Sequence, residues 1–466
     1  MEESFVRADT AAIVLAAGKG TRFRSELAKV LHTAAGRTLV GHVLAALAPL
    51  GLGQIIVVVG HQADAVREEV AASGLANVTT VDQTEQRGTG HAVQQAVPAL
   101  AEGIERVLVL PGDTPLLTAD WLEQLLADGA AHGGAMATSR LDDPTGYGRV
   151  LRDDDGTVTG VVEQRDATDD QLAIEEINAG TYLFARSGLA AALERLDDDN
   201  SQGELYLTDV VALQADAGTP LAATAASDDV IAGVNDRAQL ADAAAELRRR
   251  HLHHLMTEVG VTVEDPATTY VDVDVEVARD AVLRPGTILA SGTRVGERTV
   301  VGPHSHLTAC EVGADATVES TRADQAVIGD AATVGPFAHL RPGTHLGTRS
   351  KVGAYVETKN ARLGEGTKAP HLAYLGDVTV GEHANISCGV IVVNYDGQVK
   401  SHTTIGDGAF VGCDTMLVAP VTIGDGAYTA AGSTITDDVP VGALAIARAR
   451  QTVKEGWVAR RRGTEG

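Results

Sequence analysis

The sequence predicts two differently built domains: an N-terminal α/β domain of Rossmann type and a C-terminal left-handed parallel β-helix made of hexapeptide repeats. The first indication is a strand-like apolar run, Ala11–Leu15, that leads directly into the glycine-containing segment Ala16–Arg22. The second is an aliphatic residue that returns at every sixth position far downstream. A six-residue period fits neither a strand nor an α-helix. It indicates one short strand and one turn per repeat, so that three repeats close a triangular coil.

Length, charge and cysteine content narrow the class of protein. The 466 residues exceed one ordinary core, so two or three domains are expected. The net charge of −26 argues against binding to nucleic acid or to an anionic membrane surface. Cys310, Cys388 and Cys413 have no CxxC spacing, which favours free thiols in a reducing compartment. No signal-peptide pattern is seen and no apolar run approaches the ~20 residues of a membrane span, so we expect a cytoplasmic protein without a membrane partner.

Residues 1–237 alternate between strand and helix patterns. Short apolar runs at 13–15, 54–60 and 106–110 predict strands, and amphipathic patterns at 39–50 and 63–72 predict helices. This alternation is typical of a parallel sheet covered by helices on both faces. Ligands of such sheets bind beyond the carboxyl ends of the strands. Two candidate segments follow predicted strands and should lie at that edge: Gly18–Arg22 and Gly112-Asp113.

Residues 238–258 are predicted to form a helical linker. Asp236 and Gln239 make a plausible capping pair at its start. An apolar stripe that includes Leu240 and Leu247 lies along one face of the predicted helix, and Arg248–Arg250 stand in its second half, where positive charge complements the helix dipole. We interpret the segment as a stiff connector and the three arginines as a solvated face.

Residues 259–466 carry the six-residue period. The residues in step are Val271, Val277, Leu283, Leu289, Val295, Val301 and Leu307; Ile328, Val334, Leu340, Leu346 and Val352; Val380, Ile386 and Val392; and Ile405, Val411, Leu417, Ile423, Thr429 and Ile435. These side chains should point into the prism and stack as one buried column. The separations between Val352 and Val380 and between Val392 and Ile405 are not multiples of six, which predicts two loops that leave the coil. Binding and catalytic residues often lie on such loops.

The glycine-containing segment near the N-terminus does not match the common nucleotide-binding fingerprints. It lacks the Gly-Lys-Ser/Thr of a P-loop and the third glycine of a dinucleotide fingerprint. Its glycines would still let the backbone approach a triphosphate, with positive charge from Lys19, Arg22 and Lys29. On these residues alone, an ordinary tight turn between strand and helix is the favoured interpretation.

Longer motifs carry a family resemblance. The run Leu15–Arg22, followed by Lys29–His32, resembles the sugar-1-phosphate nucleotidyltransferases. Further segments resemble the bifunctional GlmU family, in which N-acetylglucosamine-1-phosphate uridyltransferase is fused to glucosamine-1-phosphate N-acetyltransferase: 83–91, 111–116, 144–149, 162–163, 176–180, 233–235 and 368–377. The resemblance spans essentially the whole chain. Phe23 and Ala28 depart from it, because Met and Pro are usual at these positions.

The resemblance implies two consecutive reactions that make UDP-N-acetylglucosamine for cell-wall synthesis. The acetyl group of acetyl-CoA would pass to glucosamine 1-phosphate, and the resulting N-acetylglucosamine 1-phosphate would attack UTP and release pyrophosphate. The family also implies Mg²⁺ as cofactor and a homotrimer. The residues implied to bind UTP and UDP-N-acetylglucosamine are Leu15, Ala16, Ala17, Gly18, Lys29, Gln83, Gly88, Thr89, Pro111, Gly112, Asp113, Gly148, Glu163, Asn178 and Asn235. Among them, Asp113 and Asn235 would hold the metal, and Lys29 would act with Arg22 in catalysis.

The resemblance likewise implies a second site in the β-helix. His371 would accept the proton of the sugar amine, a role that suits an imidazole, and Asn394 would aid catalysis. Glu357 would orient or polarise His371, although a structural carboxylate of the β-helix is an equally good interpretation of Glu357. The sugar phosphate would contact Arg341, Lys359, Tyr374 and Asn385. Acetyl-CoA would contact Cys388, Asn394, Tyr395, Lys400, Cys413, Ala431, Arg448 and Trp457, the last from a neighbouring chain. Cys388 and Cys413 stand where the family commonly has Ala and Ser.

Two other functions are compatible with parts of the sequence. A nucleotide-sugar pyrophosphorylase could use its β-helix only for assembly or regulation, but the set His371, Asn394, Tyr395, Lys400 and Arg448 argues against this. A non-enzymatic β-helix scaffold could carry a degenerate N-terminal domain, against which Lys29, Asp113 and Asn235 argue. Within the bifunctional hypothesis, an acetyl-cysteine intermediate is conceivable, and direct transfer to the amine is favoured.

Overall fold

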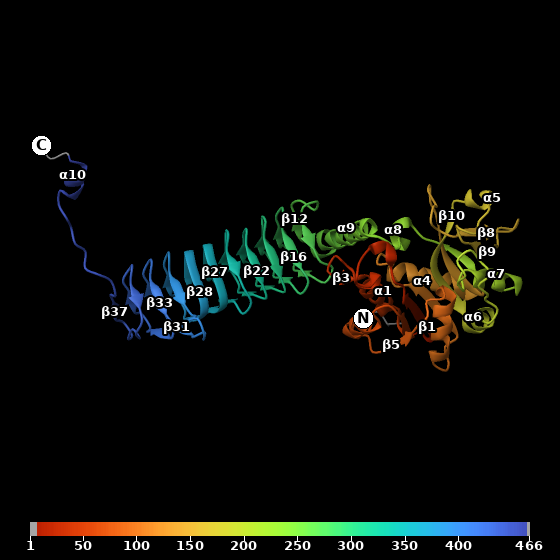
Figure 1. Ribbon diagram of the computed structural model, residues 1–466, viewed down its shortest axis with the longest axis horizontal. Helices are drawn as coiled ribbons and strands as arrows, with labels where there is room; N and C mark the ends of the chain where they lie inside the picture. Colours follow the sequence, from red (N-terminus) through yellow and green to blue (C-terminus); the bar gives the residue numbers. More distant parts are fainter. Residues whose placement is uncertain (1–6, 464–466) are drawn as a thin grey trace. The chain divides into compact units, whose positions relative to one another are not determined.

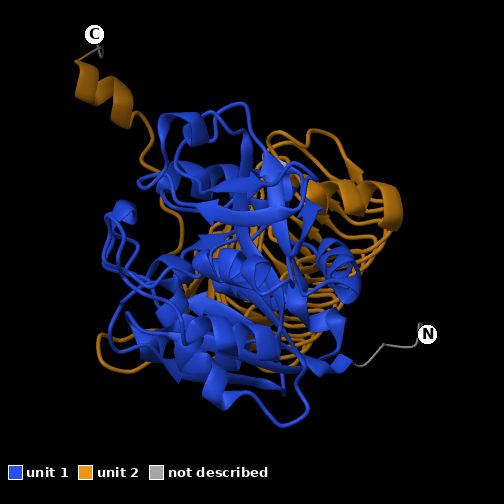
Figure 2. Cartoon of the chain, turned by 90° about the vertical axis from the view of Figure 1, so that its right-hand side faces the viewer, with its two compact units in different colours: residues 1–248 blue, residues 249–466 orange. Residues whose placement is uncertain are grey.

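The computed structural model describes residues 7–463, apart from the side chain at 228, and divides into two compact units (Figure 2). The first unit extends to Arg248 and the second begins at Arg249. The boundary falls within α9 (Arg237–His254), the helix expected as a linker. In the part of the chain that is described, no helix is both long and apolar enough to cross a membrane.

The first unit is built on a twisted sheet (Figure 1). Its strands are β1 (Arg7–Ala16), β4 (Leu52–Val59), β5 (Val78–Asp82), β6 (Arg106–Pro111), β7 (Gly134–Arg140), β8 (Arg149–Arg152), β9 (Val158–Val162), β10 (Glu176–Ala185) and β11 (Ala222–Ala225), beside a small pair β2 (Thr33–Ala34) and β3 (Arg37–Thr38). The strand order is β11-β7-β10-β6-β1-β4-β5, with β8 and β9 at the side of β10. The sheet is mixed rather than parallel throughout, because β10 runs antiparallel to both β6 and β7.

Helices cover both faces of this sheet, as the alternating pattern predicts. They are α1 (Leu39–Leu47), α2 (Ala63–Ala72), α3 (Thr89–Ala96), α4 (Ala119–Asp128), α5 (Asp169–Leu172), α6 (Arg186–Leu193), α7 (Asp209–Asp216), α8 (Asp228–Ile231) and α9, with short helices η1 (Thr21–Phe23), η2 (Lys29–Leu31), η3 (Ala48–Leu50), η4 (Val97–Ala99) and η5 (Gly129–Ala131). Successive residues of β1 enter different cores: Ile13 packs with the cluster that includes α3, α6 and α7, and Val14 with the cluster that includes α1, α2 and α4. Burial on both faces explains why the strands read as continuous apolar runs.

The second unit is a parallel β-helix. Its strands are β12 (Thr262–Val263), β13 (Tyr270–Val271), β14 (Glu276–Val277), β15 (Val282–Leu283), β16 (Ile288–Ala290), β17 (Arg294–Val295), β18 (Val300–Val301), β19 (His306–Thr308), β20 (Glu311–Val312), β21 (Thr317–Val318), β22 (Arg322–Asp324), β23 (Val327–Ile328), β24 (Thr333–Val334), β25 (His339–Leu340), β26 (His345–Leu346), β27 (Lys351–Leu363), β28 (Lys368–Val380), β29 (Asn385–Ile386), β30 (Ile391–Val393), β31 (Thr403–Ile405), β32 (Phe410–Val411), β33 (Met416–Val418), β34 (Val421–Ile423), β35 (Tyr428–Thr429), β36 (Thr434–Ile435) and β37 (Leu444–Ala445). Each strand pairs with the third strand along the chain over most of the unit, so three strands make one coil. Val271 lies beside Leu289 and Leu289 beside Leu307.

The predicted column of inward side chains is confirmed. All the residues that the six-residue period placed in the prism are buried, including Val271, Leu340 and Ile435. They form one continuous core that begins at Leu252 and Leu255, where the end of α9 and the π-helix η6 (Leu255–Val259) cap the first coil. Stacked coils therefore bury one apolar column from end to end.

Only one of the two predicted loops forms. The segment between Val352 and Val380 stays in the prism, where Val352, Leu363 and Val380 are all core residues. Its phase changes because two steps, from Thr358 to Leu363 and from Leu375 to Val380, are five residues instead of six, and all four residues still point inward. The second break does produce a loop, in which Tyr395 bridges to Lys400.

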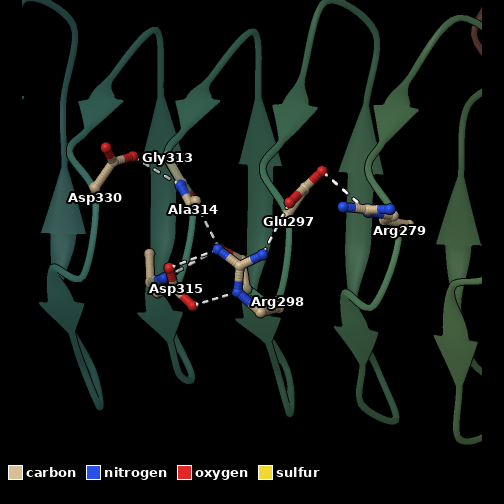
Figure 3. Close-up of polar contacts among 9 residues, drawn as sticks. Arg279, Glu297, Arg298, Gly313, Ala314, Asp315 and Asp330 are labelled. Carbon is tan, nitrogen blue, oxygen red and sulfur yellow. Dashed lines mark hydrogen bonds and ion pairs between the residues drawn. The ribbon is translucent and has the colours of Figure 1, made fainter.

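Charged side chains link the turns of successive coils on the outside of the prism (Figure 3). Arg298 donates to Glu297 at 2.8 Å and, through two nitrogens, to Asp315 of the next coil at 2.7 and 2.9 Å. Arg279 of the preceding coil contacts Glu297 at 3.2 Å, and Asp330 accepts from the main-chain N–H of Ala314 at 2.8 Å. These exposed pairs contribute little stability individually, but they align the turns of adjacent coils.

Candidate active sites

The carboxyl ends of four parallel strands bring the predicted nucleotide residues to one edge of the first sheet. β1, β4, β5 and β6 run in the same direction, and Gly18, Gln83 and Asp113 each follow one of them. Gly20 has φ +59°, and a Cβ at this position would lie 2.6 Å from the Cβ of Lys29. Glycine therefore lets the loop turn closely around Lys29. Phe23 is buried against His32, which anchors the remainder of the loop.

A cavity of about 520 Å³ opens at this edge. Its lining contains Leu15, Ala17, Gly18, Lys29, Gln83, Gly88, Thr89, Pro111, Asp113, Glu163 and Asn178, all of them predicted binding residues. Ala16, Gly112, Gly148, Asn235 and Arg22, also predicted, are not among the residues that line it. Ala16 is buried behind the loop, and the main chain of Gly148 holds Asn178 by accepting its N–H at 2.9 Å. The volume suits a small-molecule ligand.

Two cations and two oxygen ligands converge beside the cavity. The ammonium of Lys29 forms an ion pair with Asp113 and donates to the side-chain oxygen of Asn235 at 3.2 Å. Arg22 donates to the same oxygen at 2.9 Å. The carboxylate of Asp113 and the amide oxygen of Asn235 therefore both face the ammonium of Lys29. A sparse oxygen set of this kind fits Mg²⁺, which keeps water and takes phosphate oxygens as its other ligands.

The opposite part of the cavity is polar and closely packed. Glu163 accepts a hydrogen bond from the hydroxyl of Thr208 at 3.2 Å, and burial raises the pKa of Glu163. Asn178 donates to Tyr182 at 2.6 Å and accepts from the main chain of Gly180 at 3.1 Å. These groups can receive and donate hydrogen bonds to the hydroxyl and amide groups of a sugar.

Lys19, expected to supply positive charge, also lines the cavity, and several lining residues were missed by the sequence analysis: Val30, Gln86, Ala92, Gly180, Tyr182, Glu204, Leu207 and Thr208. A signal for some of them exists, because Asn178, Gly180 and Tyr182 alternate on one face of β10 with the period of a strand. Glu204 and Thr208 follow a long irregular segment, and neither periodicity nor a motif marks them.

In the second unit, the residues predicted to bind the sugar phosphate come from neighbouring strands: Lys359 is on β27, Tyr374 on β28 and Asn385 on β29, and Arg341 directly follows β25. Glu357 lies opposite Tyr374 in the ladder and accepts from Arg341 at 2.9 Å. The neighbouring cations Lys400 and Arg341 lower the pKa of Lys359. Lys359, Lys400 and Arg341 thus place three positive charges close together. Such a cluster suits a phosphate. Asn385 lies in a different strand ladder, between Lys368 of the preceding coil and Phe410 of the following coil.

Asp377 connects this cluster to the predicted acetyl-CoA loop and was not predicted. It accepts hydrogen bonds from Asn360 at 2.8 Å and from the buried side chain of Asn394. Burial raises the pKa of Asp377, but these two hydrogen bonds and the charges of Lys400 and Lys359 outweigh it, so the pKa is lowered overall. Asp377 therefore remains ionised and holds Asn394 in place.

The remaining predicted residues are exposed to solvent. His371 is exposed on β28, opposite Ala354. Cys388 and Cys413 are exposed free thiols, and their carbonyl oxygens accept from Asp414 and Gly432 of the following coils, both at 2.8 Å. Ala431, Arg448, Tyr395 and Trp457 are exposed as well. His371, Cys388, Cys413 and Ala431 form an open strip along successive coils, whereas Trp457 lies on α10 (Trp457–Arg462), after the last coil.

Both units are similar to known protein families. Residues 12–216 match a family model described as a MobA-like NTP transferase domain, and residues 402–437 match one described as bacterial transferase hexapeptide (six repeats). Curated relatives named "Bifunctional protein GlmU" match almost the whole chain. The protein from Kineococcus radiotolerans is 53% identical over 97% of this chain and 93% of its own length. Those from Mycolicibacterium gilvum and Streptomyces avermitilis are 51% and 52% identical, over 97% of this chain and 92% and 94% of theirs.

Proposed function

The chain belongs to the family of bifunctional GlmU proteins, and from that premise we propose how its two units divide two consecutive reactions. The β-helix transfers the acetyl group of acetyl-CoA to the amine of glucosamine 1-phosphate. The α/β unit then joins N-acetylglucosamine 1-phosphate to the uridylyl group of UTP and releases pyrophosphate. The product is UDP-N-acetylglucosamine, a precursor for cell-wall synthesis.

The observation that carries the uridylyltransferase assignment is the cluster of Lys29, Asp113, Asn235 and Arg22 beside the cavity. A phosphate oxygen of the sugar phosphate attacks the α-phosphorus of UTP, and the bond to pyrophosphate breaks. No protein nucleophile is needed, so the chain contributes by positioning reactants and by stabilising charge. Lys29 and Arg22 donate to the phosphate oxygens. A bound Mg²⁺, held by Asp113 and Asn235, would supply further positive charge.

Recognition of the two substrates is divided between the ends of the cavity. Gln83, Gly88 and Thr89 bind the uracil ring. Glu163 and Asn178 bind the sugar hydroxyl and amide groups, with Gly148 supporting Asn178 through its main chain. The loop Leu15–Gly18 passes along the nucleotide, where small side chains let the backbone approach closely.

Acetyl transfer depends on a base and on a phosphate anchor. His371 accepts a proton from the amine, whose lone pair attacks the thioester carbonyl; the bond to sulfur breaks and coenzyme A leaves as its thiol after protonation. Arg341, Lys359, Tyr374 and Asn385 hold the sugar phosphate. Glu357 balances the charge of Arg341. Asn394 and Tyr395 orient the acetyl group, and Cys388, Lys400, Cys413, Ala431 and Arg448 contact the coenzyme.

We further propose that three copies of the chain assemble and complete the acetyltransferase sites. The support is the exposure of the coenzyme residues along one strip of the prism and the half-exposed indole of Trp457, 50% accessible, near the C-terminus. A neighbouring prism would convert the strip into a cleft, and Trp457 of one copy would cover the site of another. Three free thiols fit a reducing compartment such as the cytoplasm.

The two activities can be separated by single substitutions. Coenzyme A release and pyrophosphate release are measured with wild type, His371→Ala and Asp113→Ala. We expect His371→Ala to lose the first and keep the second, and Asp113→Ala to do the reverse. A pyrophosphorylase with a purely structural β-helix would release no coenzyme A even as wild type. Loss of both activities in either variant, with folding intact, would contradict the assignment.

A further inference from the structure

We infer that His91 is a positioning residue for base recognition, because it fixes the side-chain amide of Gln83 in one orientation. The inference rests on the proposed uridylyltransferase function and names a residue that selects the base. His91 is partly buried on α3 and does not line the cavity. It therefore acts through Gln83.

The amide of Gln83 is oriented by the main chain. Gln83 follows β5, is only 4% exposed and lines the cavity. Its side-chain nitrogen donates to the carbonyl oxygen of Gly88 at 3.1 Å. A carbonyl oxygen can only accept, so the end of the amide that faces Gly88 must be the NH₂ group.

His91 takes the second hydrogen of that NH₂ group. Its Nδ1 lies 3.1 Å from the side-chain nitrogen of Gln83 and must accept, so the ring is neutral and carries its proton on Nε2. Nε2 lies 3.1 Å from the side-chain amide of Gln95, one helical turn further along α3. Because Nε2 donates there, the Gln95 amide presents its oxygen, an assignment that needs only a half-turn of that amide. Gln95 thus selects the tautomer of His91 that accepts from Gln83.

The side-chain oxygen of Gln83 is the part of the amide that remains available to a ligand. Both hydrogens of the NH₂ group are used, and the side-chain oxygen of Gln83 accepts no hydrogen bond from any described residue of the protein. This oxygen can only accept, so it selects a ring that offers an N–H donor. Uracil offers N3–H between two carbonyl groups, whereas N3 of cytosine carries a lone pair and would oppose the oxygen. The main-chain N–H of Gly88, which donates to no described group, suits a flanking carbonyl of uracil.

Discrimination between UTP and CTP tests this role. We compare kcat/KM for the two nucleotides, by pyrophosphate release, in wild type, His91→Ala and His91→Asn. Without His91 the Gln83 amide keeps one anchor and can turn, so we expect the UTP:CTP ratio to fall about tenfold or more, mainly through KM for UTP. Asparagine can place its side-chain oxygen near the position of Nδ1, so His91→Asn should retain most of the ratio. Calorimetric titration with UTP and CTP gives the same ratio for a variant that binds but turns over poorly.

A neighbouring glutamine provides the matched control. Gln94 on the same helix donates to the carbonyl oxygen of Leu193 at 2.8 Å and does not line the cavity. Gln94→Ala should leave the UTP:CTP ratio unchanged even if it disturbs the helix, and acetyl transfer should be normal in every variant. An equal loss for UTP and CTP in His91→Ala, or no recovery in His91→Asn, would overturn the role of His91. Failure of the wild type to use UTP would instead overturn the proposed function.

Discussion

The ammonium of Lys29 contacts the carboxylate of Asp113 directly, and the two side chains are each only 16% exposed. The same nitrogen also donates to Asn235, the other proposed metal ligand, at 3.2 Å. Lys29 therefore provides the positive charge that these two oxygens require. A divalent cation and the ammonium cannot both occupy this position, so metal binding should move Lys29 outward, toward the phosphates of the nucleotide.

The first prediction follows from this competition. Lys29→Met should bind Mn²⁺, used as a spectroscopic substitute for Mg²⁺, about tenfold more tightly than wild type in the absence of nucleotide. Removal of a partly buried ammonium frees the carboxylate, and charge pairs in such surroundings are worth roughly 1 kcal/mol or more. Electron paramagnetic resonance titration of free Mn²⁺ measures the affinity without turnover. Asp113→Asn should weaken it. Equal or weaker binding by Lys29→Met would contradict the competition.

Sequence periodicity predicted most of the second unit and the reason is physical. Each residue in step must fill the same narrow prism, so only aliphatic or small β-branched side chains fit, as at Val271, Leu340 and Thr429. The change of phase near Thr358 misled the prediction, because a five-residue step and a loop both shift the count. Only the geometry of β27 and β28 distinguishes them. In the first unit, alternation predicted helices on both faces but could not reveal that β10 runs antiparallel.

The candidate sites divide in the same way. Residues within motifs, such as Lys29 and Asp113, are close in sequence to glycine turns and could be predicted. Asp377 and Thr208 could not be predicted, because each acts through a hydrogen-bond partner that is distant in the sequence and is brought close only by the fold. Asp377 meets Asn394 only through the stacking of two coils, and Thr208 meets Glu163 across 45 residues.

The second prediction concerns Asp377. Asp377→Asn keeps the shape of the side chain but removes the negative charge and one of two acceptors, so one of the donors Asn360 and Asn394 loses its partner. Lys359 and Lys400 also lose their counter-charge. We expect coenzyme A release to fall roughly 10- to 100-fold, the effect of losing a charged hydrogen bond. Pyrophosphate release is the internal control and should be unchanged. Unaltered acetyl transfer would show that the Asp377–Asn394 contact has no part in it.

The third prediction separates direct transfer from a covalent intermediate. Cys413→Ser should keep acetyltransferase activity within about twofold, because the carbonyl oxygen of Cys413, which accepts from Gly432, is unaffected and a hydroxyl replaces the thiol. Steady-state rates with acetyl-CoA check this, and Cys388→Ala provides the matched thiol change nearby. An acetyl-cysteine found by mass spectrometry, together with an inactive but folded Cys413→Ser, would favour the covalent route instead.

The fourth prediction tests the buried column. Leu340 is fully buried in the prism, whereas Leu444 is 61% exposed on β37. Leu340→Ala should lower the free energy of unfolding of the second unit by about 2–5 kcal/mol, since it removes apolar contacts and leaves a cavity. Leu444→Ala should change it by less than about 0.5 kcal/mol. Denaturant unfolding followed by loss of acetyl transfer measures both; similar effects of the two substitutions would be inconsistent with a common core column.

The fifth prediction is a pH dependence of the first unit that arises at His42. This residue lies on α1, is 6% exposed, and its Nε2 lies 2.8 Å from the carbonyl oxygen of Ala34. The carbonyl can only accept, so Nε2 carries a hydrogen and donates it. Burial lowers the pKa of His42 from 6.5 to about 4.

The sign follows from the two values. Between pH 6.5 and pH 4 the unfolded chain binds a proton at His42 more readily than the folded unit does. The contribution of His42 to the free energy of unfolding is therefore fully present above pH 6.5 and is lost as the pH falls toward 4. The loss approaches about 3 kcal/mol at the lower end. His42→Gln keeps a donor for Ala34 without a titrating ring, so its unfolding free energy should fall less over this range. His132→Gln, a change at an exposed histidine, should behave as wild type.

Tryptophan fluorescence can follow the first unit alone. Trp121 lies in it, at the start of α4, and Trp457→Phe removes the signal of the second unit. Urea unfolding of the three proteins in this background is compared at pH 7.5, 5.5 and 4.5. At pH 5.5 the difference between His42→Gln and wild type should shift by roughly 1 kcal/mol relative to pH 7.5. Curves that stay parallel at all three values would mean that the proton on His42 is not coupled to folding, because coupling requires the two states to bind it differently.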